Sequence, residues 1–173
     1  MVPQRFKVRF MPLLAVAVIG WLAAGCNASY LKAAVGPTQG NRANGEVRFY
    51  KVDGGVRVVA KIGGLSPGKH GFHVHEKGDC SAPDASSAGG HFNPDGAPHG
   101  APTSPRGARH AGDLGNLEAG PDGTARYDRV DALLDYAQLT GLSVLVHAGE
   151  DDYVSQPAGN SGARVGCGVI GMP

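Results

Sequence analysis

The stretch EVRFYKVDGGVRVVAKI, residues 46–62, contains two runs of alternating polar and apolar side chains on either side of Asp53-Gly54-Gly55. Alternation with a period of two places the apolar side chains on one face of a β-strand, and a glycine-containing turn joins two such strands. The stretch therefore predicts a β-hairpin. The whole chain has 28 glycines, 12 prolines and no long helical pattern, which indicates an all-β protein with many turns.

Further strands are expected on both sides of this hairpin. Two glycine-rich segments between them, residues 77–111 and 149–162, show no strand pattern, and a loop as long as the first is usually functional in a compact domain. No repeat and no second domain is visible. The residues alone thus indicate a single antiparallel barrel or sandwich with two long loops. The other expected strands cover residues 30–35, 70–76, 113–118, 124–130, 142–147 and 163–170.

The first residues are typical of an export signal. Arg5, Lys7 and Arg9 precede an apolar run at 13–24 that is too short to span a bilayer. The run ends at LAAGC, which resembles a bacterial lipobox with Cys26 as the lipidated mature N-terminus, although ordinary signal cleavage is the alternative. We expect a signal peptide at 1–25, a tether and start of the first strand at 26–40, and a folded domain at 30–173. The protein is then exported to a bacterial periplasm or cell envelope and lipid-anchored to a membrane.

Cysteines and net charge restrict the function further. Once Cys26 is set aside, only Cys80 and Cys167 remain, and an exported protein meets an oxidising compartment. One long-range disulfide is the natural inference, worth roughly 3–5 kcal/mol. Metal-ligating thiolates are the weaker alternative because neither cysteine has a close ligating neighbour. The formal charge is +1, without a basic stripe in the sequence, so nucleic acid is not an expected partner.

Six of the seven histidines fall in segments that can hold metal ions. His73 and His75 lie two apart on an expected strand, so both side chains point to one face. His147 ends another strand and could complete a set around the same ion. His70 has the opposite parity, and we expect it to bond a loop backbone instead.

The first long loop supplies His91, His99 and His110, followed by Asp113. Three imidazoles and one carboxylate form a closed set suited to structural zinc. The strand histidines with a shared His91 give four nitrogens, which suit Cu(II). Asp151 could accept hydrogen bonds from ligands of both metals, and its alternative role is that of a solvated acid.

In this order, the segments closely resemble the copper/zinc superoxide dismutases from about Tyr30 to the C-terminus. The segments are GFHVHEKGDC (71–80), GGHFNP (89–94), HGAP (99–102), RHAGDLGN (109–116), VLVHAGEDD (144–152) and ARVGCGVIG (163–171). The resemblance implies an eight-stranded antiparallel Greek-key β-barrel with one copper and one zinc per subunit. It also implies an intrasubunit disulfide between Cys80 and Cys167. The implied copper ligands are His73, His75, His91 and His147, and the implied zinc ligands are His91, His99, His110 and Asp113.

The resemblance further implies a function, the dismutation of superoxide to dioxygen and hydrogen peroxide through a Cu(II)/Cu(I) cycle. His91 bridges the metals and carries a proton, and Arg164 docks the anionic substrate. A homodimer is possible, because dimer contacts differ between lineages of this fold. The second loop is short and acidic, so long-range steering is expected to be weaker or to use Arg106 and Arg109. The alternative function is a non-catalytic protein that buffers copper and zinc.

Overall fold

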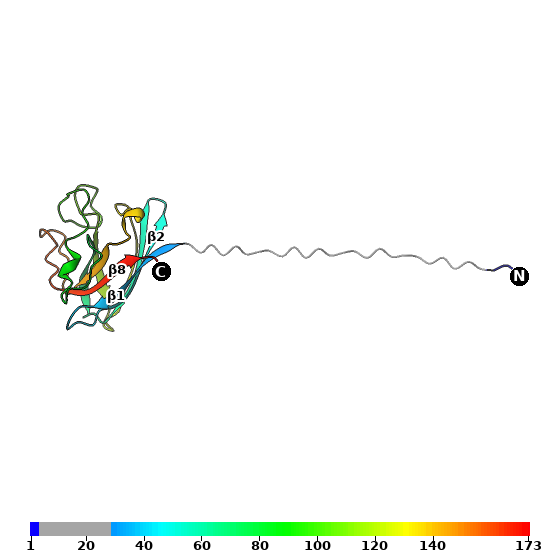
Figure 1. Ribbon diagram of the computed structural model, residues 1–173, viewed down its shortest axis with the longest axis horizontal. Coiled ribbons are helices and arrows are strands. Elements are labelled where there is room, and N and C mark those ends of the chain that lie inside the picture. Colours follow the sequence, from blue (N-terminus) through cyan, green and yellow to red (C-terminus); the bar gives the residue numbers. More distant parts are fainter. Residues whose placement is uncertain (4–28) are drawn as a thin grey trace.

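The computed structural model describes residues 1–3 and 29–173, and it contains eight strands and two short 3-10 helices (Figure 1). The expected signal peptide and Cys26 lie outside the described residues. In the part that is described, no helix has the length and apolar character needed to cross a membrane. The strands are β1 (Tyr30–Pro37), β2 (Asn44–Val52), β3 (Gly55–Gly63), β4 (Gly68–His75), β5 (Asp113–Ala119), β6 (Ala125–Asp131), β7 (Ser143–His147) and β8 (Arg164–Gly171).

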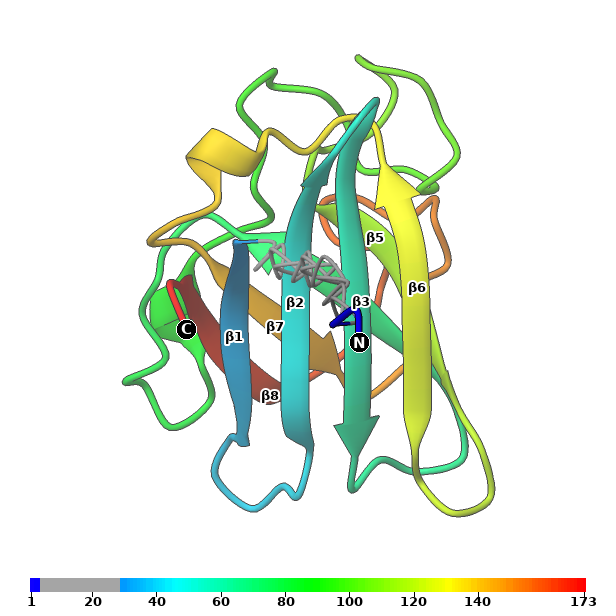
Figure 2. The same cartoon turned by 90° about the vertical axis from the view of Figure 1, so that its right-hand side faces the viewer.

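These strands form one closed antiparallel barrel in the order β1-β2-β3-β6-β5-β4-β7-β8. The chain leaves the consecutive order twice, between β3 and β4 and between β6 and β7, and these crossovers give the Greek-key connectivity. The predicted eight-stranded Greek-key barrel is therefore confirmed. β1, β2, β3 and β6 form one side of the barrel, which Figure 2 shows without loops in front of it.

The predicted hairpin pairs β2 with β3 in regular register, from Asn44 opposite Gly63 to Val52 opposite Gly55. Gly55 has φ +147°, and a Cβ there would lie 2.1 Å from the backbone oxygen of Asp131. Glycine is therefore required where the hairpin turn passes the end of β6. All eight expected strands are present, with ends that differ by one or two residues from the expected ones.

The barrel interior is filled by the alternate apolar side chains of all eight strands. Phe49 and Phe72 are fully buried there, and Phe72 packs against Tyr127 with 5.2 Å between ring centroids. Every strand, the main hydrophobic cluster and the disulfide lie within residues 30–171. This part of the chain thus contains all the contacts that close and fill the barrel.

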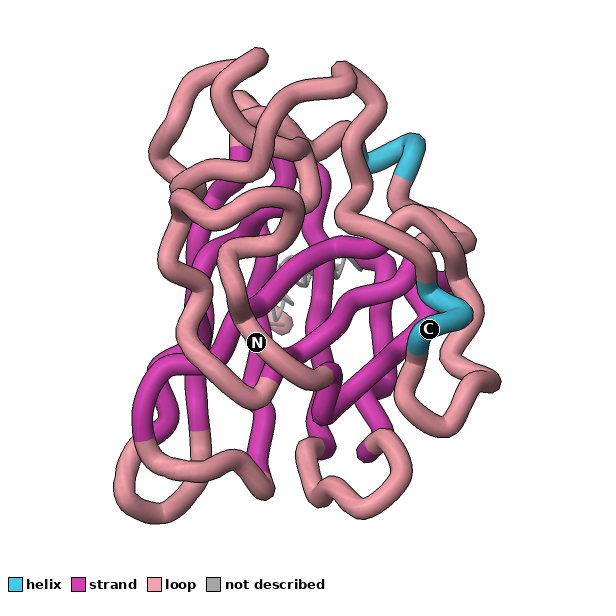
Figure 3. The backbone as a smooth tube through the Cα atoms, turned by 90° about the vertical axis from the view of Figure 1, so that its left-hand side faces the viewer, coloured by secondary structure: helices cyan, strands magenta, loops and turns pink. Residues whose placement is uncertain are grey.

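On β4 the alternation places Phe72 and Val74 in the core and His73 and His75 on the outer face, yet all four residues are buried. The burial comes from the loops. The long connection from β4 to β5 and the loop from β7 to β8, green and orange in Figure 1, cover this side of the barrel, and Figure 3 shows loops over it from the side opposite to Figure 2. The 3-10 helices Ser86–Ala88 and Tyr136–Gln138 lie in connections and were not expected from the sequence.

Candidate metal centre

Four of the predicted ligands meet on the outer face of β4 and β7. His73 and His75 come from β4, and His147 comes from the end of β7, where the ladder to β8 shifts register. His91 belongs to the long loop, but its backbone forms an isolated bridge with His75. One side-chain nitrogen from each of the four residues lies within 4.8 Å of the others, and all four residues are buried.

Each of these imidazoles is fixed through one nitrogen and presents the other to the centre of the cluster. His75 Nδ1 bonds the carbonyl of Gly89 at 3.0 Å, and His147 Nδ1 bonds the carbonyl of Gly162 at 3.1 Å. His73 uses Nε2, which is 2.8 Å from Asp151 Oδ2. Such outer contacts set the ring orientation of a metal-binding histidine.

The opposite nitrogens have no hydrogen-bond partner. Within residues 1–3 and 29–173, the buried side-chain polar atoms without a hydrogen-bond partner are all imidazole nitrogens, and all but one of them belong to this histidine cluster. A buried polar atom without a partner costs free energy, so this set points to a bound cation as the missing partner. The residues present therefore fit a metal ion with four nitrogen ligands. The atoms of this set are His73 Nδ1, His75 Nε2, His91 Nε2 and His147 Nε2.

Burial lowers the pKa of the histidines in this first set. The pKa of His91 falls to about 4 and that of His147 to about 3, mainly because the buried site disfavours a charged ring. Burial also lowers the pKa of His73 and His75. The rings are therefore neutral near pH 7, which is the form that binds metals.

The second predicted set gathers around one carboxylate oxygen. Asp113 Oδ1 lies 2.8 Å from His91 Nδ1, 3.1 Å from His99 Nδ1 and 3.1 Å from His110 Nδ1. Its other oxygen accepts hydrogen bonds from the backbone N–H groups of Gly100 and His110. Burial raises the pKa of Asp113, but hydrogen bonds from the three histidines outweigh burial and hold the pKa well below the usual range. Three imidazoles and one ionised carboxylate fit a tetrahedral zinc site.

Asp151 lies between the two sets and contacts one histidine of each. It is fully buried, and its oxygens lie 2.8 Å from His73 Nε2 and 2.9 Å from His99 Nε2. The side chain of Asn116 bonds both the N–H and the carbonyl of Asp151. Burial lowers the pKa of His99, but hydrogen bonds to Asp113 and Asp151 outweigh it and raise the pKa to about 9. The two carboxylates thus favour positive charge at this ring.

Gln156 is a contact of the second set that the sequence did not reveal. Its side-chain oxygen accepts from His99 N–H at 2.8 Å, and its Nε2 donates to the His99 carbonyl at 2.9 Å. The nearby Gly159 has φ +65°, and a Cβ there would lie 1.9 Å from Asp151 Oδ1 and 2.7 Å from His99 Nε2. The loop at 149–162 therefore closes directly over His99, and no sequence pattern marked these two positions.

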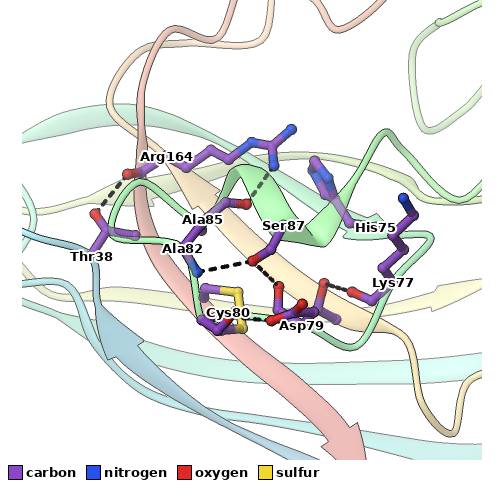
Figure 4. The surroundings of a disulfide bond; sticks show 12 residues. Thr38, His75, Lys77, Asp79, Cys80, Ala82, Ala85, Ser87 and Arg164 are labelled. Carbon is purple, nitrogen blue, oxygen red and sulfur yellow. Dashed lines mark hydrogen bonds between the residues drawn. A yellow bond between two sulfur atoms is a disulfide. The ribbon is translucent and has the colours of Figure 1, made fainter.

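The predicted disulfide joins Cys80 and Cys167 and is confirmed. Figure 4 shows Arg164 in the same region, with its guanidinium close to His75. The guanidinium donates to the carbonyls of Ala85 and Gly89 at 2.6 and 2.7 Å, and the latter carbonyl also accepts from His75. Arg164 is partly exposed beside the first histidine set. It is thus fixed by the segment that the disulfide ties to β8.

The expectation that Arg109 could steer an anion was wrong. Arg109 is only 3% exposed and forms an ion pair with Asp131 at 2.7 Å. It also donates hydrogen bonds to the carbonyls of His110 and Asp113, so it stabilises the end of the long loop before β5. An arginine enclosed in this way cannot attract a solute from solvent. Arg106 is exposed, but it pairs with Asp95.

The model for copper/zinc superoxide dismutase matches residues 43–170, which include both histidine sets and the disulfide. The chain belongs to the copper/zinc superoxide dismutase family. Among solved structures, it is similar to the clock protein EA4, with 40% sequence identity and a TM-score of 0.72. That similarity covers 86% of this chain and 98% of the EA4 chain.

Membership of the copper/zinc superoxide dismutase family agrees with the geometry of both sets. The groups that could hold a metal ion contain the eight ligand positions predicted from the sequence, with His91 counted in both. The roles of the individual residues, including Arg164 and Asp151, stay predictions.

Proposed function

We propose that this protein dismutes superoxide, converting two superoxide ions and two protons into dioxygen and hydrogen peroxide. The observation that carries the proposal is the position of His91 between two buried ligand sets, with Nε2 facing one set and Nδ1 facing the other. Family membership supports the same activity. The neighbour EA4 is described as a clock protein, so turnover has to be measured in this chain.

The two sets differ in the ion that each would hold. His73, His75, His91 and His147 would hold copper, which supplies a one-electron Cu(II)/Cu(I) couple for oxidising one superoxide and reducing the next. His91, His99, His110 and Asp113 would hold zinc, which has no redox chemistry and fixes the loop. The proposed content is one copper and one zinc per subunit.

His91 and Arg164 are the proposed catalytic residues. Nδ1 of His91 is held at Asp113, so Nε2 is the atom that can take up a proton and deliver it to the reduced oxygen species. Arg164 keeps its guanidinium beside His75 through two backbone carbonyls, and its positive charge would attract and orient the superoxide anion there. Loss of orientation at such a site reduces turnover even when the charge is retained.

The proposed setting is the bacterial periplasm or cell envelope, with a lipid anchor at Cys26. It is supported by the leader-like sequence at 1–25 and agrees with a disulfide, which persists in an oxidising compartment. A homodimer is possible in this setting. Nucleic acid is not a proposed partner.

The proposal is tested by measuring metal content and superoxide dismutation of the purified protein before and after addition of copper and zinc. We expect about one copper and one zinc per chain, and activity that His147→Ala abolishes while zinc remains bound. Val146→Ala, a neighbour that faces the core, serves as the matched control and should keep its activity. Full metal binding without turnover would instead support the alternative, a copper- and zinc-buffering protein.

A further inference from the structure

The outer face of β1, β2, β3 and β6 is a grid of three rows, in which each residue lies opposite its neighbour on the adjacent strand. We call it the basic face, because it carries five Lys and Arg residues and two acidic ones. Its members are separated in the sequence by up to about a hundred residues, so only the barrel brings them together. The rows are Ala34-Glu46-Lys61-Arg126, Lys32-Arg48-Val59-Asp128 and Tyr30-Tyr50-Arg57-Val130.

The basic face contrasts with the rest of the molecule. The chain has 16 Lys and Arg, three of which lie in the leader-like segment, and 15 Asp and Glu. Apart from the basic face, residues 29–173 carry thirteen acids against eight bases. The domain as a whole is therefore net negative, while one side of it is net positive. Such a separation of charge orients a protein in the field of an anionic surface.

Two pairs of like charges lie directly across from each other on the basic face, Lys32 opposite Arg48 and Lys61 opposite Arg126. Like charges in this arrangement destabilise a sheet. Among the described residues, Lys32, Lys61 and Arg126 form no ion pair, although Arg48 pairs with Glu46. An anionic partner would relieve this repulsion.

A groove of about 550 Å³ runs along the basic face and is lined by Arg48, Lys61 and Arg126 together with Thr124, Asn44 and the acidic Glu46. Glu46 pairs with Arg48, so the cations left for a phosphate group are Lys61 and Arg126, beside the neutral hydrogen-bonding side chains of Thr124 and Asn44. Arg48 is held over the ring of Tyr30, with 5.2 Å from its guanidinium carbon to the ring centroid. The groove thus has at least one cation that is already oriented.

The basic face lies on the opposite side of the barrel from the candidate metal centre. In the closed ring of strands, β2 and β3 lie opposite β4 and β7, which carry His73, His75 and His147. Figures 1 and 2 show the β1-β2-β3-β6 side away from the long loops. A surface bound to the basic face would therefore leave the metal centre turned toward solvent.

We propose that the basic face docks on an anionic phospholipid surface. A lipid surface fits better than a soluble polyanion because the third row is amphipathic and lies where β1 begins. Tyr30 and Tyr50 pack with 5.4 Å between ring centroids, and the exposed Val130 ends the same row on the far side of Arg57. Tyrosine is favoured at the boundary between headgroups and acyl chains. Only three residues separate Tyr30 from Cys26, so lipidation at Cys26 would hold this row near a bilayer.

The test uses residues 29–173, which contain the complete barrel, so that the result does not depend on the proposed lipid anchor. Binding is measured by co-sedimentation with vesicles of phosphatidylcholine, with and without about one-third phosphatidylglycerol. The face variant is K32Q/K61Q/R126Q. The matched control is K69Q/K77Q/R106Q, which removes three exposed cations elsewhere. Thermal unfolding checks that all proteins are folded, and dismutase activity is recorded separately.

We expect this net-negative domain to bind the anionic vesicles and not the neutral ones. Each cation near such a surface contributes roughly fivefold in partitioning, so the face variant should bind about a hundredfold more weakly and the control nearly as well as the wild type. About 0.5 M salt should release the protein. Equal loss in both variants, or binding to dextran sulfate but not to the vesicles, would overturn the proposal. Lipid binding is measured independently of turnover, so the experiment can contradict the docking proposal without contradicting the proposed dismutase function, and the reverse.

Discussion

Arg164 shows how one side chain can combine a charge with a fixed direction. Two carbonyls hold its guanidinium beside His75, and burial lowers the pKa of this group. We expect Arg164→Ala to lower kcat/KM roughly tenfold or more and to flatten its decline with ionic strength. Arg164→Lys should keep part of the salt dependence, although an ammonium cannot hold both carbonyls in the same way. Stopped-flow superoxide decay over a salt series measures both effects, and unchanged kinetics at low ionic strength would contradict the assignment.

Gln156 offers a second test among single residues. Because its amide holds both backbone polar groups of His99, Gln156→Ala should weaken zinc binding roughly 10- to 100-fold. Zinc affinity is measured by chelator competition, and the visible bands of a cobalt-substituted site report the geometry around His99. Ser155→Ala, which removes only an exposed contact with Asp152, is the control. Equal zinc affinity and an unchanged cobalt spectrum in Gln156→Ala would show that the contact does not position His99.

Residue types in the sequence predicted the ligand sets, but not how the other side chains support them. The spacing of His73 and His75 fixes a common face, and the opposite parity of His70 correctly predicted backbone bonds, which it makes to His147 and Ser66. Arg109 looked like an exposed loop cation because its partner Asp131 is 22 residues away, at the end of β6. Burial of this kind depends on long-range packing and leaves no local pattern.

At the level of elements, the disulfide connects β8 to the segment that holds Arg164. Cys80 and Cys167 are separated by 87 residues, so Cys80→Ser/Cys167→Ser should lower the free energy of unfolding by about 4–5 kcal/mol. The carbonyls of Ala85 and Gly89 would also be held less firmly. We therefore expect lower dismutase activity at temperatures where the variant is still folded. Denaturant titration with activity assays at matched folded fractions separates the two effects, and full activity would show that Arg164 needs no disulfide.

The positions of the strands in the sequence were easier to predict than which strands pair with each other in the barrel. Alternating side chains located β2 and β3, and β7 was marked by its continuous apolar run. The pairing of β3 with β6 and of β4 with β7 could not be derived in the same way, because those strands are far apart in the chain. The residues alone allowed a barrel or a sandwich, and the eight-stranded Greek-key order came from the family resemblance. The basic face depends on this strand order, so it could not be predicted from the residues alone either.

For the molecule as a whole, zinc should act as a clamp between the two long loops. His99 belongs to the first loop and contacts Asp151 and Gln156 of the second. Zinc at a thousandfold excess over its Kd should add about 4 kcal/mol of stability and raise the Tm by roughly 10 °C. His110→Ala should reduce this shift, whereas His70→Ala should leave it in place. Calorimetry with zinc alone measures the shift, and an equal shift in His110→Ala would place the zinc elsewhere.

The closed barrel has a consequence for the order of assembly. Each of the eight described strands has a neighbour on both sides, although β5 and β6 pair only through Ala119 and Ala125, so the ring of strands closes without any contribution from a metal. The two groups that could hold metal ions lie outside this ring, between β4, β7 and the loops that cover them. We therefore expect that the barrel can fold first and that the proposed metals can be bound afterwards. The last step in forming the proposed enzyme would then be metal binding, and we expect that a protein that has lost its metals can bind them again without unfolding and refolding.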